Sequence, residues 1–364
     1  MTLDIVETPA AVVDLDRVRT NIRRVAEYCR EHGIAWRPHV KTHKSRRMAR
    51  LELDAGATGL TVATPFEAEV MASVSDDLLL AYPPVGEAKL ARLMALPPSV
   101  DLSVALDSVE ALGPLAAAAV AARRRVGVLV ELDLGARRVG VPSPAQAVAL
   151  ARAAADLEGV EYRGVAFYPG HIRAPLDHQG GAIAQLSLDV GAFVAALSDS
   201  GLAPAVVSGG STPTLFRSHE IGHLTEVRPG TCIFYDRDIV AMDVASWDDI
   251  AYTVLATVVS TAVSGRATID AGSKALSKET FRSGGSAFGV LYDHPEVEVV
   301  SLSEEHGVLD LSSTAWCPRV GDRVRVVPNH VCVSTNLQDR LLVRQGDDVT
   351  AWRIDARGRG ARGV

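Results

Sequence analysis

The sequence predicts an α/β protein: a (β/α)8 barrel of the TIM type followed by a second, C-terminal all-β domain. Between residues 10 and 228, short apolar runs alternate with helical segments. Continuous apolar strands that alternate with helices indicate a parallel sheet covered on both faces. Eight such units in roughly 220 residues fit a barrel better than an open, doubly wound sheet. No G-x-G-x-x-G motif follows an early strand, which weakens the doubly wound alternative further.

The barrel elements follow one another in a regular order. Asp16 can cap the helix after the first strand, and Thr64 with Pro65 opens a later helix as an N-cap followed by proline. The expected strands are 10–14, 33–36, 59–63, 78–82, 102–106, 126–132, 162–167, 205–208 and 225–228. Helices are expected at 18–26, 48–55, 86–96, 108–123, 144–157 and 180–200, and a further helix is expected to begin at Thr64.

Near residue 245 the pattern changes, because helical periodicity ends and runs rich in β-branched residues begin. Strands are expected at 251–259, 267–270, 297–300, 324–327 and 341–343. We therefore divide the chain into a barrel domain of residues 1–242 and a β-strand domain of residues 243–364. The first strand, 10–14, can also join the β-strand domain.

Composition excludes several classes of partner. The 364 residues include 37 basic and 44 acidic side chains, and the net charge of -7 argues against nucleic acid or an anionic membrane as a partner. No segment approaches the ~20 apolar residues that a membrane span needs, and the first residues lack the features of a secretory signal. Four cysteines without paired spacing favour the reducing cytoplasm and no disulfides.

The segment RPHVKTHK at 37–44 places Lys41 after the apolar run 33–36. A long charged side chain at a strand end is costly to bury without a task. Lysine can form a Schiff base with an aldehyde cofactor once burial or a cationic neighbour favours its neutral form. The alternative is a basic strand edge that keeps the sheet soluble.

Two further loops follow predicted barrel strands. The loop DLGARRVG at 133–140 contains Arg138, whose planar fork can hold a phenolate or a carboxylate. Tyr168 and His171 follow the next strand and can stack on a flat ring or move a proton. The alternatives are a surface turn for the arginine and a buried tyrosine with a satisfied hydroxyl.

The loop SGGSTPT at 208–214 is the clearest anion-binding signal. Two glycines follow a strand and two hydroxyl residues precede a helix, so backbone N–H groups and the helix N-terminus suit a phosphate. Late barrel loops are a frequent phosphate site. The alternative is an ordinary turn with a Ser/Thr cap. The residues expected to form the cradle are Ser208, Gly209, Gly210, Ser211, Thr212, Gly230 and Thr231.

In the β-strand domain, His330 and Cys332 stand two residues apart in the segment PNHVC at 328–332. On a strand, both side chains would face the same side and could chelate one metal, or they are a chance pair. Asp270, Lys274 and His306 are further polar groups in apolar surroundings, which either line the same site or stabilise loops.

A strand-end lysine, an arginine fork and a phosphate nest together describe a site for pyridoxal 5′-phosphate (PLP), whose ring acts as an electron sink. The segments at 38–44, 133–140, 208–214 and 328–332 resemble motifs of the D-threonine aldolase/D-serine dehydratase family. The resemblance runs from Thr8 to about Ile354. It implies a fold-type III PLP enzyme, built like alanine racemase, with PLP and a divalent metal, Zn or Mn, as cofactors.

The resemblance also implies residue roles. Lys41 would carry PLP, Arg138 would lie near the cofactor ring, and Tyr168 would border it. His330 and Cys332 would bind the metal beside the β-hydroxyl of the substrate. The residues expected to act in catalysis are Lys41, Arg138, Tyr168 and His171.

Two positions depart from the family pattern. Aldolases often carry His-x-Asp at the metal site, whereas Cys332 is more similar to the zinc-dependent dehydratases. Many aldolases place a histidine six residues after the active-site tyrosine. This chain has Ala174 at that position, and its histidine, His171, comes three residues earlier.

We expect a metal-assisted PLP lyase that cleaves the Cα–Cβ bond of D-3-hydroxy-α-amino acids, giving glycine and an aldehyde. The alternative is elimination of water from D-serine or 3-hydroxyaspartate, giving a keto acid and ammonia. A racemase would need a second acid/base on the opposite ring face. A non-catalytic PLP-binding protein would need no His-x-Cys metal site. The expected partners are a small D-amino acid and a second copy of the chain in a homodimer.

Overall fold

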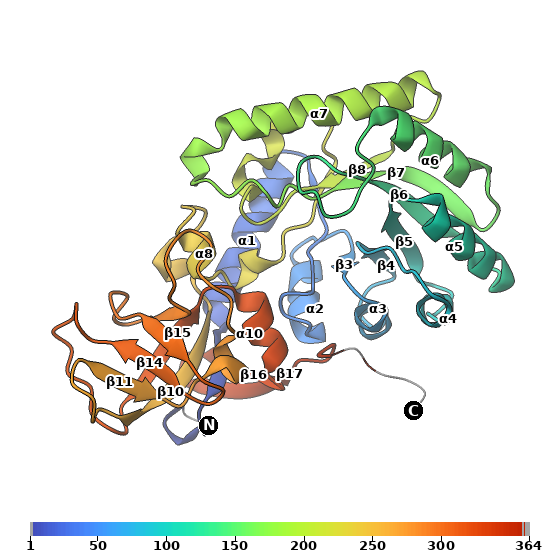
Figure 1. Cartoon of the computed structure of the whole chain (residues 1–364). Coiled ribbons are helices and arrows are strands. Elements are labelled where there is room, and N and C mark those ends of the chain that lie inside the picture. The colour runs from blue at the N-terminus through green and yellow to red at the C-terminus, as the bar shows by residue number, and fades with distance from the viewer. Residues whose placement is uncertain (1–2, 359, 361–364) are drawn as a thin grey trace. The chain divides into compact units, whose positions relative to one another are not determined.

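A computed structural model describes residues 3–358 and 360, which form two compact units (Figure 1). Unit 1 comprises residues 3–23, 42–45 and 231–358, and unit 2 comprises residues 24–41, 46–230 and 360. The chain passes from unit 2 into unit 1 between Gly230 and Thr231, earlier than the boundary at 242/243 that we expected from the sequence.

Unit 2 is built on eight strands in the order β2-β9-β8-β7-β6-β5-β4-β3. Each neighbouring pair in this order is parallel. The segment that follows β2 also bonds to β3 at the other end of this order, because Thr61 N–H donates to Pro38 O at 2.9 Å and Val40 N–H donates to Thr61 O at 3.0 Å. The predicted barrel is therefore confirmed. Its strands are β2 (Ala35–Trp36), β3 (Leu60–Val62), β4 (Asp77–Leu80), β5 (Asp101–Leu106), β6 (Val126–Leu132), β7 (Val160–Phe167), β8 (Val206–Gly209) and β9 (Glu226–Val227).

Helices alternate with these strands, and Figure 1 shows α5, α6 and α7 outside them. Local caps explain where two of them begin. Thr64 Oγ1 accepts a hydrogen bond from Glu67 N–H at 3.1 Å, and Ser143 Oγ accepts one from Gln146 N–H at 3.4 Å. The helices are α1 (Leu15–Glu31, which begins in unit 1), α2 (Arg46–Asp54), α3 (Pro65–Met71), α4 (Glu87–Met94), α5 (Val109–Ala121), α6 (Pro144–Asp156) and α7 (Gly180–Asp199), with 3-10 turns η2 (Leu176–His178) and η3 (Leu215–Glu220).

Helix α7 departs from one expectation. Contrary to the sequence analysis, it is long and apolar enough to cross a membrane, by length and composition alone. Its buried residues are Ile183, Leu186, Val190, Phe193, Val194 and Leu197. Their spacing of three or four residues defines one apolar face. A helix with one buried face is what the outer layer of a barrel requires.

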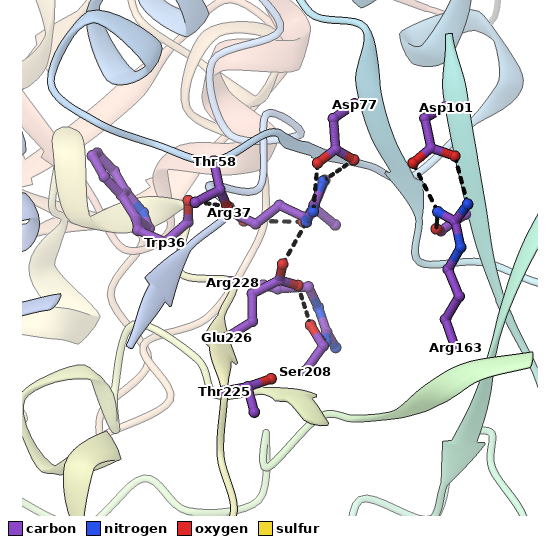
Figure 2. Close-up of polar contacts among 12 residues, drawn as sticks. Trp36, Arg37, Thr58, Asp77, Asp101, Arg163, Ser208, Thr225, Glu226 and Arg228 are labelled. Carbon is purple, nitrogen blue, oxygen red and sulfur yellow. Dashed lines mark hydrogen bonds and ion pairs between the residues drawn. The ribbon is translucent and has the colours of Figure 1, made fainter. Parts of the chain in front are cut away.

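A polar cluster lies among the barrel strands (Figure 2). Arg37 Nε donates to Glu226 at 2.7 Å, and its two terminal nitrogens donate to Asp77 at 2.6 and 2.8 Å. Ser208 Oγ donates to the other Glu226 oxygen at 2.5 Å, and Arg228 donates to Ser208 Oγ at 2.6 Å. Burial lowers the pKa of Arg37, but the bonds and charges of Asp77 and Glu226 outweigh burial and raise it. Arg37 therefore remains a cation.

Unit 1 is mostly β. Its sheet has the order β13-β14-β11-β10-β1-β16-β17, while β15 pairs with both β10 and β12. Strand β1 (Ala10–Asp14) lies antiparallel to β10 and parallel to β16, so the first strand belongs to this sheet. Val12 on β1 packs with Leu255, Leu342 and Val349 in its core.

The other strands of unit 1 are β10 (Tyr252–Ser260), β11 (Arg266–Ile269), β12 (Gly289–Leu291), β13 (Val299–Leu302), β14 (Gly307–Asp310), β15 (Arg323–Pro328), β16 (Arg340–Gln345) and β17 (Asp348–Arg353). The all-β expectation needs one correction, because short helices interrupt the strands. They are α8 (Arg237–Val240), α9 (Ser273–Leu276) and α10 (Val331–Leu337), with 3-10 turns η1 (Leu3–Ile5), η4 (Thr231–Ile233) and η5 (Trp247–Asp249).

The prediction that His330 and Cys332 share a strand is wrong. Strand β15 ends at Pro328 and α10 begins at Val331, so Cys332 lies in the first turn of a helix. The Asn329 side chain donates to the carbonyl oxygens of Glu279 and Ala287 at 3.0 and 2.7 Å, and Val331 N–H donates to a carboxylate at 3.0 Å. These contacts give Asn329 and Val331 partners outside the sheet, so that the chain leaves β15 and enters α10.

We predict that Arg37→Ala lowers the free energy of unfolding by about 3–5 kcal/mol, because it leaves Glu226 buried without its cation. The Glu226 side chain is 7% exposed. Arg163→Ala is the matched control, since Arg163 pairs with Asp101, whose side chain is 52% exposed, and should cost about 1 kcal/mol or less. Denaturant titration of both variants tests this. Equal losses of unfolding free energy in the two variants would show that breaking the buried Arg37 contacts costs no more than breaking an exposed ion pair.

Candidate active site

Lys41, Tyr168 and Arg138 come together in unit 2, as their positions after barrel strands predicted. Tyr168 directly follows β7, and its ring centre lies 6.0 Å from Lys41 Nζ and 4.7 Å from Arg138 Cζ. Both cations are therefore within range of the aromatic ring. Within the described part of the chain, the half-buried Lys41 ammonium makes no hydrogen bond or ion pair. It remains available to a ligand.

Two buried ionisable residues, Glu131 and Arg228, lie near Arg138. Burial raises the pKa of Glu131, and the nearby Arg228 and Arg138 oppose that rise. Burial lowers the pKa of Arg228, which Glu131 and Glu226 counteract. Arg228 also donates to the carbonyl oxygen of Phe167, the residue before Tyr168, at 3.0 Å. The site therefore has a fixed internal cation and a buried carboxyl group beside it.

The loop 208–214 has the properties of an anion cradle. Gly210 has a φ of +83°, in the left-handed region that glycine adopts without strain. A Cβ at Gly209 would lie 2.2 Å from the Phe167 ring, so no larger residue fits there. Residues 210–212 are buried, and within the described chain their N–H groups donate no hydrogen bond. Buried N–H groups without partners are costly, so this loop fits a phosphate.

His171 follows β7, and its ring packs against Gly135 of the separate loop that carries Arg138. A Cβ at Gly135 would be 2.8 Å from His171 Cε1, so the imidazole packs directly on the glycine backbone. His171 is otherwise exposed. Among the described residues, His171 forms no hydrogen bond or ion pair with Lys41 or Tyr168, and its catalytic role stays a prediction.

The second group of predicted residues lies in unit 1. Cys332 Sγ is 3.2 Å from Thr42 Oγ1 and 3.9 Å from Thr231 Oγ1. His330 Nδ1 is 3.0 Å from Asp236 Oδ2. Thr231, which we expected at the phosphate, thus has its hydroxyl beside the cysteine, and its phosphate role stays a prediction.

The His330 environment is strongly anionic. Burial lowers the pKa of His330, but Cys332 and the hydrogen bond with Asp236 outweigh burial and raise the pKa to about 11. An imidazole and a thiolate are donors that Zn²⁺ accepts. Binding a metal here would displace the proton from His330, because only the neutral imidazole ligates.

Within residues 3–358, no group of three or more His, Cys, Asp or Glu side chains is arranged to hold a metal ion. His330 and Cys332 would therefore supply two ligands and leave positions open to water or substrate. Catalytic metal sites keep at least one open position. The donor set fits a catalytic metal better than a structural one.

The three other polar residues singled out in the sequence, Asp270, Lys274 and His306, differ in their surroundings. Asp270 accepts hydrogen bonds from Thr257 N–H at 2.8 Å and from the Thr8 hydroxyl at 2.5 Å. Lys274 forms an exposed ion pair with Glu305 at 2.7 Å. His306 is exposed. Among the described residues, none of the three forms a hydrogen bond or ion pair with His330 or Cys332.

Sequence reasoning missed Thr42, Glu131, Glu226 and Asp236. Asp236 has one local signal, an acidic N-cap before a short helix, and this signal predicts a helix start and no metal site. The partners of Glu226 and Asp236 are distant in the chain, and the sequence alone gives no indication of them.

Comparison with known proteins identifies the class. Residues 13–238 match the family model described as alanine racemase, N-terminal domain, and residues 251–344 match a serine dehydratase domain. The chain therefore belongs to the fold-type III family of PLP-dependent enzymes that contains D-threonine aldolase and D-serine dehydratase, and the motif resemblance is confirmed.

Three curated relatives illustrate the activities in the family. D-threonine aldolase of Arthrobacter sp is 33% identical over 97% of this chain and 93% of its own length. 3-Hydroxy-D-aspartate aldolase of Paracoccus denitrificans is 32% identical over 98% and 93%. D-threo-3-hydroxyaspartate dehydratase of Delftia sp. is 33% identical over 92% and 93%. The family is thus one of PLP enzymes acting on D-amino acids, and it includes both aldolases and dehydratases.

Solved structures agree. The crystal structure of D-threonine aldolase from Filomicrobium marinum matches with a TM-score of 0.90 at 30% identity, covering 98% of this chain and 97% of that chain. Structures of a D-threo-3-hydroxyaspartate dehydratase include a cysteine-to-alanine mutant in the metal-free form, with a TM-score of 0.89 and 29% identity, covering 99% of this chain and 100% of that chain.

Proposed function

We propose that this protein is a PLP- and divalent-metal-dependent lyase that cleaves the Cα–Cβ bond of D-3-hydroxy-α-amino acids into glycine and an aldehyde. One observation carries the proposal. Lys41 and Thr42 are consecutive in the chain, and the Thr42 hydroxyl lies 3.2 Å from Cys332 Sγ. The peptide bond between Lys41 and Thr42 thus joins the lysine proposed for the cofactor to a residue whose hydroxyl contacts a proposed metal ligand.

The residues of unit 2 fit PLP. Lys41 would hold its aldehyde carbon, and the N–H groups of 210–212 would bind its phosphate together with Gly230. Arg138 and Tyr168 would border the ring. When bound, PLP supplies an electron sink for the charge that bond cleavage leaves on Cα. The buried Arg228 would keep positive charge within the site.

His330 and Cys332 would hold the metal, Zn or Mn. When bound, the metal polarises the oxygen on Cβ of the substrate. His171 as a neutral imidazole, or Tyr168 as a phenolate, would take the proton from that oxygen. The dehydratase structure that is described as a metal-free form supports metal binding in the family.

A specific observation favours a second candidate function, the elimination of water. Cysteine, as Cys332, is one of the two proposed metal ligands, and the chain has Ala174 where many aldolases carry a histidine. A metal that polarises the β-oxygen also makes hydroxide a better leaving group. The relatives support both candidates, because they include two aldolases and a dehydratase of 3-hydroxyaspartate.

We further propose a homodimer in a reducing cytoplasm. None of the four cysteines, all of which lie in the described part of the chain, forms a disulfide, and burial raises the pKa of the Cys29 thiol to about 12, which keeps that thiol protonated and unreactive. Light scattering coupled to size-exclusion chromatography would measure the oligomeric state.

The central experiment supplies PLP with Zn²⁺ or Mn²⁺ and offers the D and L forms of threonine, serine and 3-hydroxyaspartate. We predict turnover of D-3-hydroxy substrates with release of glycine and aldehyde, and at least tenfold slower turnover of the L forms. The reason is that a lysine and a metal held in place around the substrate would align the scissile bond of only one enantiomer. Keto acid and ammonia as sole products would establish the dehydratase instead. Comparable rates on D- and L-threonine would contradict the proposed arrangement.

We also predict that His330→Ala and Cys332→Ala each abolish metal-dependent turnover but leave PLP binding unchanged, because these side chains act on the metal and not on the cofactor. Cys317→Ala, at an exposed free cysteine, is the control and should behave like the wild type. Metal content, PLP absorption and turnover measure the three properties separately. Full activity in a chelated protein shown to be metal-free would refute the metal role.

A further inference from the structure

We propose that Asp236 is a positioning residue that orients the His330 imidazole for metal binding. The inference rests on the proposed function, since it assumes a metal at His330 and Cys332. Asp236 is fully buried, with an exposure of 0%. It comes from the turn before α8, whereas His330 precedes α10, so the contact joins two segments 94 residues apart.

Both carboxylate oxygens of Asp236 have hydrogen-bond partners. Oδ2 lies 3.0 Å from His330 Nδ1 and accepts from Val331 N–H at 3.0 Å, while Oδ1 accepts from Ile239 N–H at 3.0 Å. Among the described residues, Asp236 forms no ion pair with lysine or arginine. His330 is therefore the one charged partner that this buried carboxylate has in the part of the chain that the structure describes.

This geometry determines which imidazole nitrogen can ligate. An ionised carboxylate only accepts hydrogen bonds, so the nitrogen that faces it, Nδ1, must carry a proton. The lone pair that remains for a metal is on Nε2. A carboxylate on the far nitrogen fixes the ring orientation and increases the basicity of the ligating nitrogen, and losing such a partner costs metal proteins 10–100-fold in affinity.

The same carboxylate also fixes the direction of the ligand segment. By accepting from Val331 N–H next to the His330 contact, Oδ2 holds both the imidazole and the backbone that leads to Cys332. The spacing between the two donors is thereby set by Asp236 and the first turn of α10. Asp236 thus acts on the ligand pair, although it does not ligate.

A purely structural role is the competing explanation, because Asp236 is also the N-cap of α8. Asp236→Ser separates the two roles. Serine caps helices well, so the variant keeps an acceptor for Ile239 N–H, but its short side chain cannot reach His330. Asp236→Asn is the second variant, because it retains the size of the side chain and removes the negative charge.

Asp270→Asn is the matched control. Asp270 is also a unit 1 aspartate that accepts a backbone N–H, from Thr257 at 2.8 Å, and it stabilises a loop with no contact to the ligand pair. Metal affinity of the PLP-loaded proteins is measured by competition with a chromophoric chelator for Zn²⁺. PLP absorption and thermal unfolding of the metal-free proteins are recorded alongside.

We expect Asp236→Ser and Asp236→Asn to weaken Zn²⁺ binding 10–100-fold while PLP absorption stays unchanged. Asp270→Asn should remain within about threefold of the wild type, as a loop substitution away from the ligands leaves Nε2 oriented. In a His330→Ala background, Asp236→Ser should have no further effect on Zn²⁺ affinity, because its action passes through the imidazole.

Zn²⁺ affinity of Asp236→Ser within threefold of the wild type would overturn the proposal and leave Asp236 as a helix cap. If that variant does not fold, the same result for Asp236→Asn overturns it. Failure of the proposed function has a different signature: the wild type itself would bind no Zn²⁺, or would bind it equally well after His330→Ala. The positioning role would then fall together with the metal site.

Discussion

The polar interior of the barrel depends on one buried carboxylate, Glu226. One of its oxygens accepts from Arg37 at 2.7 Å and the other from Ser208 at 2.5 Å, and Arg228 donates to the same serine hydroxyl at 2.6 Å. Since buried charges require partners, this cluster fixes the ends of β2, β8 and β9. Each end leads into a loop that carries candidate site residues: Lys41 after Arg37, residues 209–212 after Ser208, and Gly230 after Arg228.

A carboxylate has a comparable part in unit 1. Asp236 is buried, caps α8, and holds both His330 and the backbone of the segment that carries Cys332. In each unit, then, a buried carboxylate contacts residues in or next to the segments that carry the proposed cofactor-binding or metal-binding side chains. Such contacts cost stability when one partner is removed, and they also give the orientation on which cofactor and metal binding depend.

The sequence predicted what local signals encode. The start of α3 follows from Thr64 and Pro65, and the turn that ends β8 follows from the glycine pair at 209–210. It did not predict contacts that tertiary packing creates. Arg37 and Glu226 are 189 residues apart, and Asp236 and His330 are 94 apart. The strand expected for His330 and Cys332 failed for the same reason, because distant carbonyl and carboxylate groups bind Asn329 and Val331.

The account depends most directly on Lys41 as the residue that carries PLP. The chain contains five lysines, at positions 41, 44, 89, 274 and 278. Borohydride reduction of the PLP-loaded protein, followed by proteolysis and mass spectrometry with fragment assignment, locates the attached pyridoxyl group. We predict that the group lies on Lys41 and not on its neighbour Lys44. Attachment to any other lysine, or no attachment, would contradict the account.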